Sequence, residues 1–184
     1  MSLLDHIDVI PDYPEPGINF YDIQSVLKKP EIWQEIINDL SELAKAANAD
    51  MIVGMESRGF LVGVPVAQNL GLPFGMVRKK GKLPGNVISQ DFQKEYGPVD
   101  TLEIQEAMIE QGARVLIMDD LLATAGTMKA TGDLVRKAGG EVIAGLVVID
   151  LHELGGAQKL DFPIDAVLQA PLDPFAQKPR LVAE

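Results

Sequence analysis

Short apolar segments that alternate with helical patterns constrain the fold of this chain more than any other feature. Helical patterns cover residues 31–47, 59–70 and 127–138, and the second and third are each followed by glycine. The apolar segments are 51–55, 74–78, 115–118, 142–149 and, more weakly, 166–168. Strands that are apolar along their whole length are buried on both faces, and helices between them favour parallel pairing. We therefore predict an α/β fold with a mainly parallel central sheet and helices on both faces.

Length and composition narrow the class of protein. The chain has 184 residues, and we expect one domain over 1–184 because no linker or repeat divides it. It contains no cysteine, which excludes disulfides, thiolate catalysis and cysteine-bound zinc, and fits a reducing cytoplasm. The longest apolar run, 142–149, is too short to cross a bilayer, and the N-terminus is acidic where a signal peptide needs basic residues. We expect a cytoplasmic protein with no membrane partner.

A basic cluster stands out against the overall charge of the chain. Net charge is −11, which argues against a nucleic-acid surface over the whole protein. The segment RKKGK follows a predicted strand and contains Arg78, Lys79, Lys80 and Lys82. A solvated run of charge is one reading. Residues 81–100, however, are rich in Gly, Pro, Asn and Asp and have no helical period, so we predict that a strand delivers these cations to a long flexible lid loop.

An acid pair and a loop of small residues follow the apolar segment 115–118. Asp119 and Asp120 are adjacent, and the residues after Leu122 are Ala123, Thr124, Ala125, Gly126 and Thr127. Such a loop before a helix offers backbone N–H groups to an anion. A plain strand-to-helix turn is the structural alternative, and neither common nucleotide fingerprint is present. The acid pair favours a binding site, because buried adjacent carboxylates are costly without partners.

Charged residues follow three of the predicted strands. Ligands of a parallel sheet bind beyond the carboxyl ends of its strands. The residues expected at this edge are Arg58, Arg78, Lys79, Lys82, Asp119 and Asp120. This mixture suits a phosphorylated sugar, whose phosphates attract cations and whose hydroxyls donate to carboxylates.

These residues resemble a known family. The segment VLIMDDLLATAGT is similar to the phosphoribosyl-pyrophosphate (PRPP) motif of the type I phosphoribosyltransferases. The chain from about residue 8 to about 170 resembles the adenine phosphoribosyltransferases in particular, through segments in the same order and spacing. Those segments are PDYPEPGINFYDI (11–23), ESRGF (56–60), RKKGKLPG (78–85) and EYG (95–97).

The resemblance implies transfer of the 5-phosphoribosyl group from PRPP to N9 of adenine, which gives AMP and pyrophosphate in purine salvage. It implies Mg²⁺ as cofactor, held mainly by the substrate rather than by a protein metal site, and a homodimer. Asp119 and Asp120 would hold the ribose hydroxyls, and the loop 123–127 would hold the 5-phosphate. The cations that would meet the pyrophosphate, some of them across the dimer interface, are Arg58, Arg78, Lys79 and Lys82.

The resemblance also assigns the base and the lid. An N-terminal segment, about 8–25, would bind adenine through stacking on Phe20 and through backbone groups near Asn19 and Tyr21. Glu95 would handle a proton near the base, and Tyr96 would help the lid close.

Two residues depart from the family pattern. Ala125 stands where a second glycine is common, and we predict that the loop is kept only if the φ angle of Ala125 is negative. Tyr21 stands where a basic residue is frequent. Glu56 is expected to form a local ion pair with Arg58, and Asp150 receives no role.

Two alternative functions stay open: a phosphoribosyltransferase for another nucleobase, and a regulatory protein that binds PRPP without turning it over.

Overall fold

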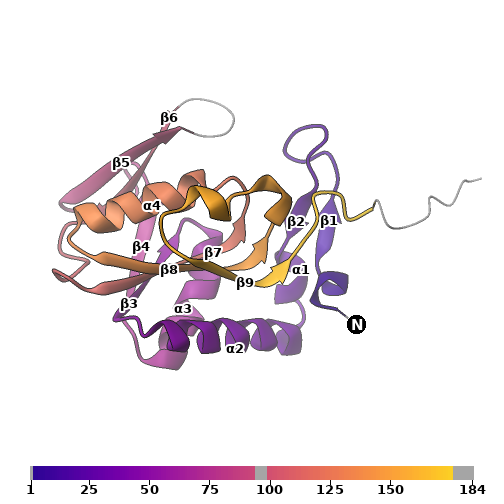
Figure 1. The fold of residues 1–184 in the computed structure, drawn as a ribbon, viewed down its shortest axis with the longest axis horizontal. Coiled ribbons are helices and arrows are strands. Elements are labelled where there is room, and N and C mark those ends of the chain that lie inside the picture. The colour runs from indigo at the N-terminus through magenta and orange to yellow at the C-terminus, as the bar shows by residue number, and fades with distance from the viewer. Residues whose placement is uncertain (1, 94–98, 176–184) are drawn as a thin grey trace, which may run out of the picture.

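A seven-stranded sheet forms the centre of the molecule (Figure 1). The computed structural model describes residues 2–93 and 99–175. The strand order is β5-β6-β4-β3-β7-β8-β9. The strands are β3 (Met51–Met55), β4 (Phe74–Lys79), β5 (Val87–Gln93), β6 (Val99–Gln105), β7 (Arg114–Leu122), β8 (Glu141–Asp150) and β9 (Ile164–Gln169).

The five strands from β4 to β9 pair in parallel, which confirms the predicted sheet. Burial is greatest in the central strands; all five residues of β3 are buried. The predicted segment 115–118 is longer than expected, because β7 continues to Leu122 and includes the acid pair. The carboxyl ends of β4, β3 and β7 lie side by side in the sheet, as the sequence predicted for the charged residues.

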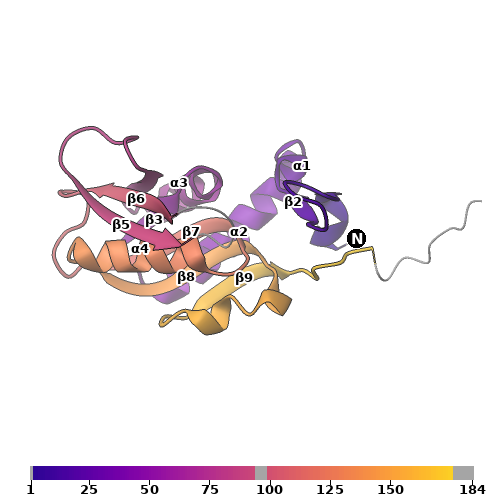
Figure 2. The ribbon, with the colours of Figure 1, turned by 90° about the horizontal axis from the view of Figure 1, so that it is seen from above.

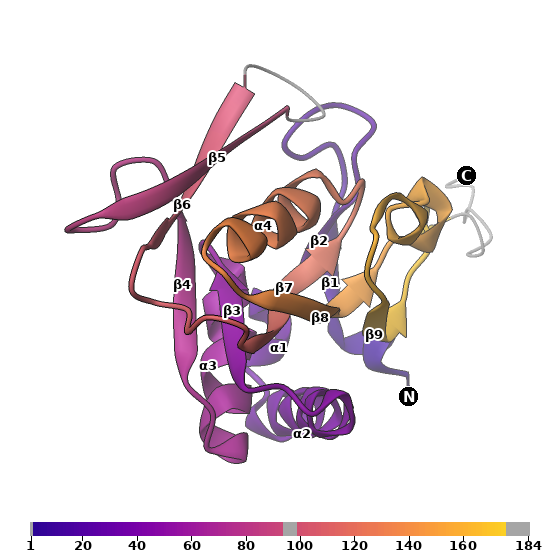
Figure 3. The same ribbon diagram turned by 60° about the vertical axis from the view of Figure 1, so that its left-hand side comes forward.

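Helices cover the two faces of the sheet and bury a separate apolar core on each (Figure 3). On one face lie α2 (Pro30–Ala47) and α3 (Arg58–Leu70). On the other lies α4 (Gly126–Lys137). Each helix has an apolar stripe toward the sheet, and α2 begins with proline at its first residue, where the missing N–H costs nothing.

Part of the predicted lid loop, 81–100, forms strands at 87–93 and 99–100. Strands β5 and β6 form an antiparallel hairpin over 87–93 and 99–105, and β6 also pairs with β4 at Lys79↔Leu102. The sequence signal was the alternation of inward and outward residues in VISQDFQ, a period of two that a search for helical spacing overlooks. In Figure 2 the hairpin lies alongside α4, where the Lys137 Nζ donates to the Ser89 carbonyl at 3.2 Å.

The two ends of the described chain meet beside the carboxyl edge of the sheet. The N-terminal part contains a 3-10 helix η1 (Leu3–His6), the two-stranded pair β1 (Asp8–Ile10) and β2 (Phe20–Asp22), and the short helix α1 (Gln24–Leu27). The 3-10 turns η2 (His152–Leu154) and η3 (Ala157–Lys159) connect β8 to β9. The chain after β9 runs next to β2 (Figure 1).

Candidate active site

The acid pair lies near the carboxyl end of β7, next to the start of α3. Asp120 is 3% exposed, and its Oδ2 lies 2.8 Å from the Arg58 Nε. This oxygen accepts no hydrogen bond despite the short distance, so the contact is an ion pair whose N–H is poorly aimed. Asp119 Oδ1 accepts the Asp120 backbone N–H at 2.9 Å. The pair is therefore only partly satisfied within the protein.

The pKa values of both carboxyl groups of the pair are raised. Burial, together with the neighbouring Asp120, raises the pKa of Asp119 well above its ordinary value. Burial also raises the pKa of Asp120, although the Arg58 guanidinium opposes it. Two adjacent carboxylates in a poorly solvated place favour partners that donate hydrogen bonds. Perturbed pKa values of this kind beside a pocket are typical of a functional site.

A glycine allows α3 to approach the acid pair. A Cβ atom on Gly59 would lie 2.7 Å from the Met118 carbonyl oxygen and 3.1 Å from Asp119 Oδ1. Any larger residue would push the first turn of α3 away from β7. The segment ESRGF thus brings Arg58 to Asp120, which explains why that motif and the acid pair occur together.

The loop between β7 and α4 surrounds a pocket of about 240 Å³. Ala125 has a φ angle of +70°, in the left-handed region, so the prediction of a negative angle is wrong. The loop tolerates this conformation at a cost of about 1–2 kcal/mol for a residue with a Cβ. Helix α4 begins at Gly126, so its free N–H groups face the loop. The pocket is lined by Asp119, Leu121, Leu122, residues 123–128, Met55, Phe92 and Gln93.

Six of these lining residues were not predicted, and three of the six come from outside the segment 119–128. Met55 ends β3, and Phe92 and Gln93 belong to the hairpin. The hairpin approaches the loop closely, since a Cβ on Gly126 would lie 3.6 Å from the Gln93 carbonyl oxygen. Strand β5, which lies within the expected lid, therefore forms one wall of this pocket.

A second pocket, of about 400 Å³, lies beside the first. The two share Leu121 and Ala123 in their walls. The Phe20 ring faces the second pocket, with Tyr13 packed edge-on at 5.1 Å between ring centroids. The Arg58 guanidinium carbon lies 4.9 Å from the Phe20 ring centroid. The walls contain residues 17–21, Arg58, Leu121, Ala123, Leu151, Leu154 and Leu172.

Asn19 and Tyr21 line this pocket, but their side chains bind the chain after β9. The Asn19 amide donates to the Leu172 carbonyl at 2.9 Å, and the Tyr21 hydroxyl donates to the Pro171 carbonyl. Leu151, Leu154 and Leu172 were missed from the sequence. Isolated leucines after a strand carry no signal for a pocket, because nothing local tells them from core residues.

The basic cluster lies at the carboxyl end of β4 and outside the linings of both pockets. Arg78 donates from Nε to Glu56 Oε2 at 3.1 Å and from a terminal nitrogen to the Lys82 carbonyl at 3.1 Å. Glu56 therefore pairs with Arg78, and the expected pair with Arg58 is wrong. Partial burial opposes the carboxylate, but the Lys79 backbone N–H and the Arg78 guanidinium prevail and lower the pKa of Glu56.

Glu95 and Tyr96 lie outside the described residues, so the roles predicted for them remain predictions. Among the described residues, no group of three or more His, Cys, Asp or Glu side chains gathers around a possible metal position. Across the same residues, no helix is both long and apolar enough to span a membrane.

Asp150, which received no role, ends β8 with its Oδ1 buried and without a hydrogen bond, and burial raises its pKa.

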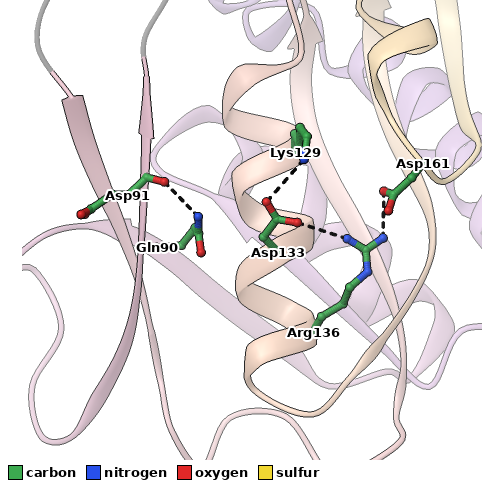
Figure 4. Close-up of polar contacts among 6 residues, drawn as sticks. All are labelled: Gln90, Asp91, Lys129, Asp133, Arg136 and Asp161. Atoms are coloured by element: carbon green, nitrogen blue, oxygen red, sulfur yellow. Dashed lines mark hydrogen bonds and ion pairs between the residues drawn. The ribbon is translucent and has the colours of Figure 1, made fainter.

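A separate charged cluster occupies the outer face of α4 (Figure 4). Lys129 and Arg136 contact Asp133 at 3.6 and 3.4 Å, and Arg136 also contacts Asp161 at 2.9 Å. The hydrogen bond from the Arg136 guanidinium lowers the pKa of Asp161. None of these four lines either pocket, so the cluster provides controls for the acid pair.

The fold and the phosphate loop define a phosphoribosyltransferase, and the model of the phosphoribosyl transferase domain matches residues 22–167. Curated relatives narrow the class further. The adenine phosphoribosyltransferase of Rhodospirillum rubrum is 45% identical over 91% of this chain and 98% of its own length. That of Gluconacetobacter diazotrophicus is 46% identical over 91% and 95%. The chain belongs to the adenine phosphoribosyltransferase family.

Solved structures agree with this assignment. The crystal structure of adenine phosphoribosyltransferase from Thermoanaerobacter pseudethanolicus superposes with a TM-score of 0.88 at 40% identity, covering 92% of this chain and all of that one. The Saccharomyces cerevisiae enzyme, complexed with adenine and an imino-altritol bisphosphate, gives 0.84 at 38% identity over 90% and 96%. Both confirm the predicted α/β fold.

Proposed function

We propose that this protein transfers the 5-phosphoribosyl group from PRPP to N9 of adenine and releases AMP and pyrophosphate, the purine-salvage reaction of its family. One observation carries the proposal: an anion pocket and an aromatic-lined pocket share Leu121 and Ala123 as a common wall. A sugar phosphate in the first pocket would present its anomeric carbon to a base in the second. The acid pair lies at this junction, since Asp119 lines the first pocket and Asp120 contacts Arg58 of the second.

The phosphate and the sugar would be held by the segment that ends β7. Residues 123–127 offer backbone N–H groups, the hydroxyls of Thr124 and Thr127, and the N-terminus of α4 to the 5-phosphate. Asp119 and Asp120 would accept hydrogen bonds from the ribose hydroxyls. Those donors would stabilise the charged carboxylates, whose pKa values are raised mainly by burial.

Departure of pyrophosphate leaves positive charge on the sugar and increases negative charge on the leaving group. Cations that are already oriented stabilise that charge most effectively. Arg78 is oriented by Glu56 and by the Lys82 carbonyl, which supports a role at the pyrophosphate. We assign Lys79, Lys82 and Arg58 to the same leaving group, some of them across the interface of a homodimer.

The base would stack on Phe20 in the pocket of about 400 Å³. Backbone groups near Asn19 and Tyr21 would read its edge, because the side chains of both residues are engaged elsewhere. Adenine offers a 6-amino donor and an N1 acceptor, and 6-oxopurines reverse both. Glu95 would handle the N9 proton, and Tyr96 would close the lid above it; both assignments rest on the family resemblance.

Mg²⁺ fits the donor set at the acid pair. Carboxylate oxygens are its preferred protein ligands, and Asp120 Oδ2 is buried without a hydrogen bond. Because the described residues contain no larger acidic cluster, the ion would take most of its ligands from PRPP and water. When bound, it would neutralise charge on the pyrophosphate. We place the enzyme in the cytoplasm, which the absence of cysteine fits.

One assay tests the proposal against its alternatives. The protein is incubated with PRPP, Mg²⁺ and adenine, hypoxanthine or guanine, and the nucleotide product is identified. We expect AMP from adenine and poor use of 6-oxopurines, since mismatched hydrogen bonds can reject a substrate by about 10⁴-fold. Equal use of hypoxanthine or guanine would indicate another purine phosphoribosyltransferase. Binding of PRPP without any product would indicate a regulatory protein.

A further inference from the structure

The chain directly after β9 is tied to the base pocket. We call residues 170–172 the C-terminal strap. The Ala170 N–H donates to the Asp150 carbonyl at 2.9 Å, and Ala170 is fully buried. The Leu172 N–H donates to Glu153 Oε1 at 3.1 Å. These bonds attach the strap to the end of β8 and to η2.

The N-terminal segment holds the strap from the opposite side. The Tyr21 hydroxyl donates to the Pro171 carbonyl, and the Asn19 amide donates to the Leu172 carbonyl at 2.9 Å. Proline has no N–H, so Pro171 and Leu172 together carry three backbone polar groups. All three are hydrogen-bonded, each to a side chain of another segment.

The fixed stretch presents an apolar side chain to the pocket. Leu172 lines the base pocket and remains 37% exposed. More than a third of the Leu172 surface still reaches water in the free protein, so part of its hydrophobic area stays unused there. A flat, mostly apolar ligand in the pocket would cover it.

Tyr21 is suited to hold the strap at any working pH. Its side chain is 1% exposed. Burial, followed by the charges of Glu153 and Asp173, raises the pKa of Tyr21 to about 12. The hydroxyl therefore stays protonated and remains a donor. Phenylalanine at this position would fill the same space but could not hold Pro171.

We propose that Tyr21 is a positioning residue that fixes the C-terminal strap, and that Leu172 of the strap forms a wall of the nucleobase site and sets its affinity for the base. Tyr21 acts through Pro171 and Leu172 and does not reach the reacting atoms. The inference rests on the proposed function, since it assigns this pocket to the base. It predicts an effect on the base and none on PRPP.

Steady-state kinetics of Tyr21→Phe test the first part. We expect the KM for adenine to rise about three- to tenfold, the usual effect of one lost hydrogen bond, while the KM for PRPP stays within twofold. Ser41→Ala is the matched control, because it also removes a buried hydroxyl that donates to a backbone carbonyl, that of Ile37 at 2.6 Å. Ser41 belongs to α2 and also accepts a hydrogen bond from Asn69 of α3 at 3.2 Å, outside both pockets. Both KM values should remain unchanged.

A double-mutant cycle tests the coupling. Leu172→Ala should raise the KM for adenine, and Leu172→Met should restore most of it by refilling the wall. If Tyr21 acts through Leu172, the double variant Tyr21→Phe/Leu172→Ala should be no worse than Leu172→Ala alone. Additive losses would overturn the proposal, as would equal effects on adenine and PRPP.

The result can be separated from a failure of the proposed function. If the unaltered protein forms no AMP from adenine and PRPP, the function itself is wrong. If it forms AMP and the Leu172 variants keep its KM for adenine, only the strap proposal fails. Leu172 is partly exposed, so its variants keep the test decisive even if Tyr21→Phe does not fold.

Discussion

The pocket proposed for the phosphate (the phosphate half) and the pocket proposed for the base (the base half) differ in how far apart in the sequence their lining residues lie. Nine of the twelve residues that line the phosphate pocket fall between Asp119 and Met128. The walls of the base pocket come from residues 17–21, Arg58, Leu121, Ala123, Leu151, Leu154 and Leu172. The first half is built mostly by one strand, one loop and one helix start, and Met55, Phe92 and Gln93 complete it. The second half is assembled by hydrogen bonds such as that from Asn19 to Leu172, 153 residues apart.

This difference separates two ways of making a pocket. The phosphate half is positioned by the central parallel sheet, so its geometry is as rigid as the core. The base half depends on a small two-stranded arm and on the C-terminal strap, which are joined by side-chain hydrogen bonds. We therefore expect changes in the phosphate half to alter PRPP use, and changes in the base half to alter adenine affinity selectively.

The largest effect should come from the acid pair. Replacing Asp119 and Asp120 by Asn removes the charged acceptors proposed for the ribose hydroxyls. Each lost charge-assisted hydrogen bond costs about 1.5–3 kcal/mol, a loss of roughly tenfold to a hundredfold. Steady-state kinetics with varied PRPP measure it. Asp133→Asn on the outer face of α4 (Figure 4) is the control and should leave kcat/KM unchanged. Normal kinetics in the double variant would make the pair structural.

A selective loss should follow from Phe20→Ala in the base half. Stacking of a base on an aromatic ring contributes about 1–3 kcal/mol, so the KM for adenine should rise while the KM for PRPP is kept. Phe20→Tyr retains the ring face and should behave like the unaltered protein. A comparable loss of PRPP affinity in Phe20→Ala would break the distinction between the two halves.

The same division explains what could be predicted from the sequence. Strand–helix alternation gave the parallel sheet, and VLIMDDLLATAGT contained most of the phosphate half, because its contacts are local. Leu172 and Leu154 could not be found, since their role depends on contacts between distant segments. The hairpin β5–β6 was missed for another reason: its period-two pattern was present, but turn-forming residues around it suggested a loop.

The acid pair should also affect stability without ligand. The raised pKa of Asp119 means that the folded protein binds a proton more readily than the unfolded chain. The stability from this group is thus fully present below the ordinary carboxyl pKa and is lost as pH rises through the raised value. Asp119→Asn should raise the Tm at neutral pH, with a smaller gain in acid. Thermal unfolding across a pH series measures this, and a pH-independent difference would contradict it.

The smallest effect concerns Ala125, the left-handed residue of the phosphate loop. Ala125→Gly relieves about 1–2 kcal/mol of steric cost, but it loses a buried methyl worth about 0.8 kcal/mol and makes the unfolded chain more flexible, by about 0.4–1 kcal/mol. The net change in the free energy of unfolding should be within about 1 kcal/mol of zero. Ala130→Gly in α4 is the control, because that alanine is equally buried in the same core but helical. It has no strain to relieve and should lose about 1–2 kcal/mol. Chemical denaturation of both variants measures the difference, and equal losses would show that the loop holds Ala125 without strain.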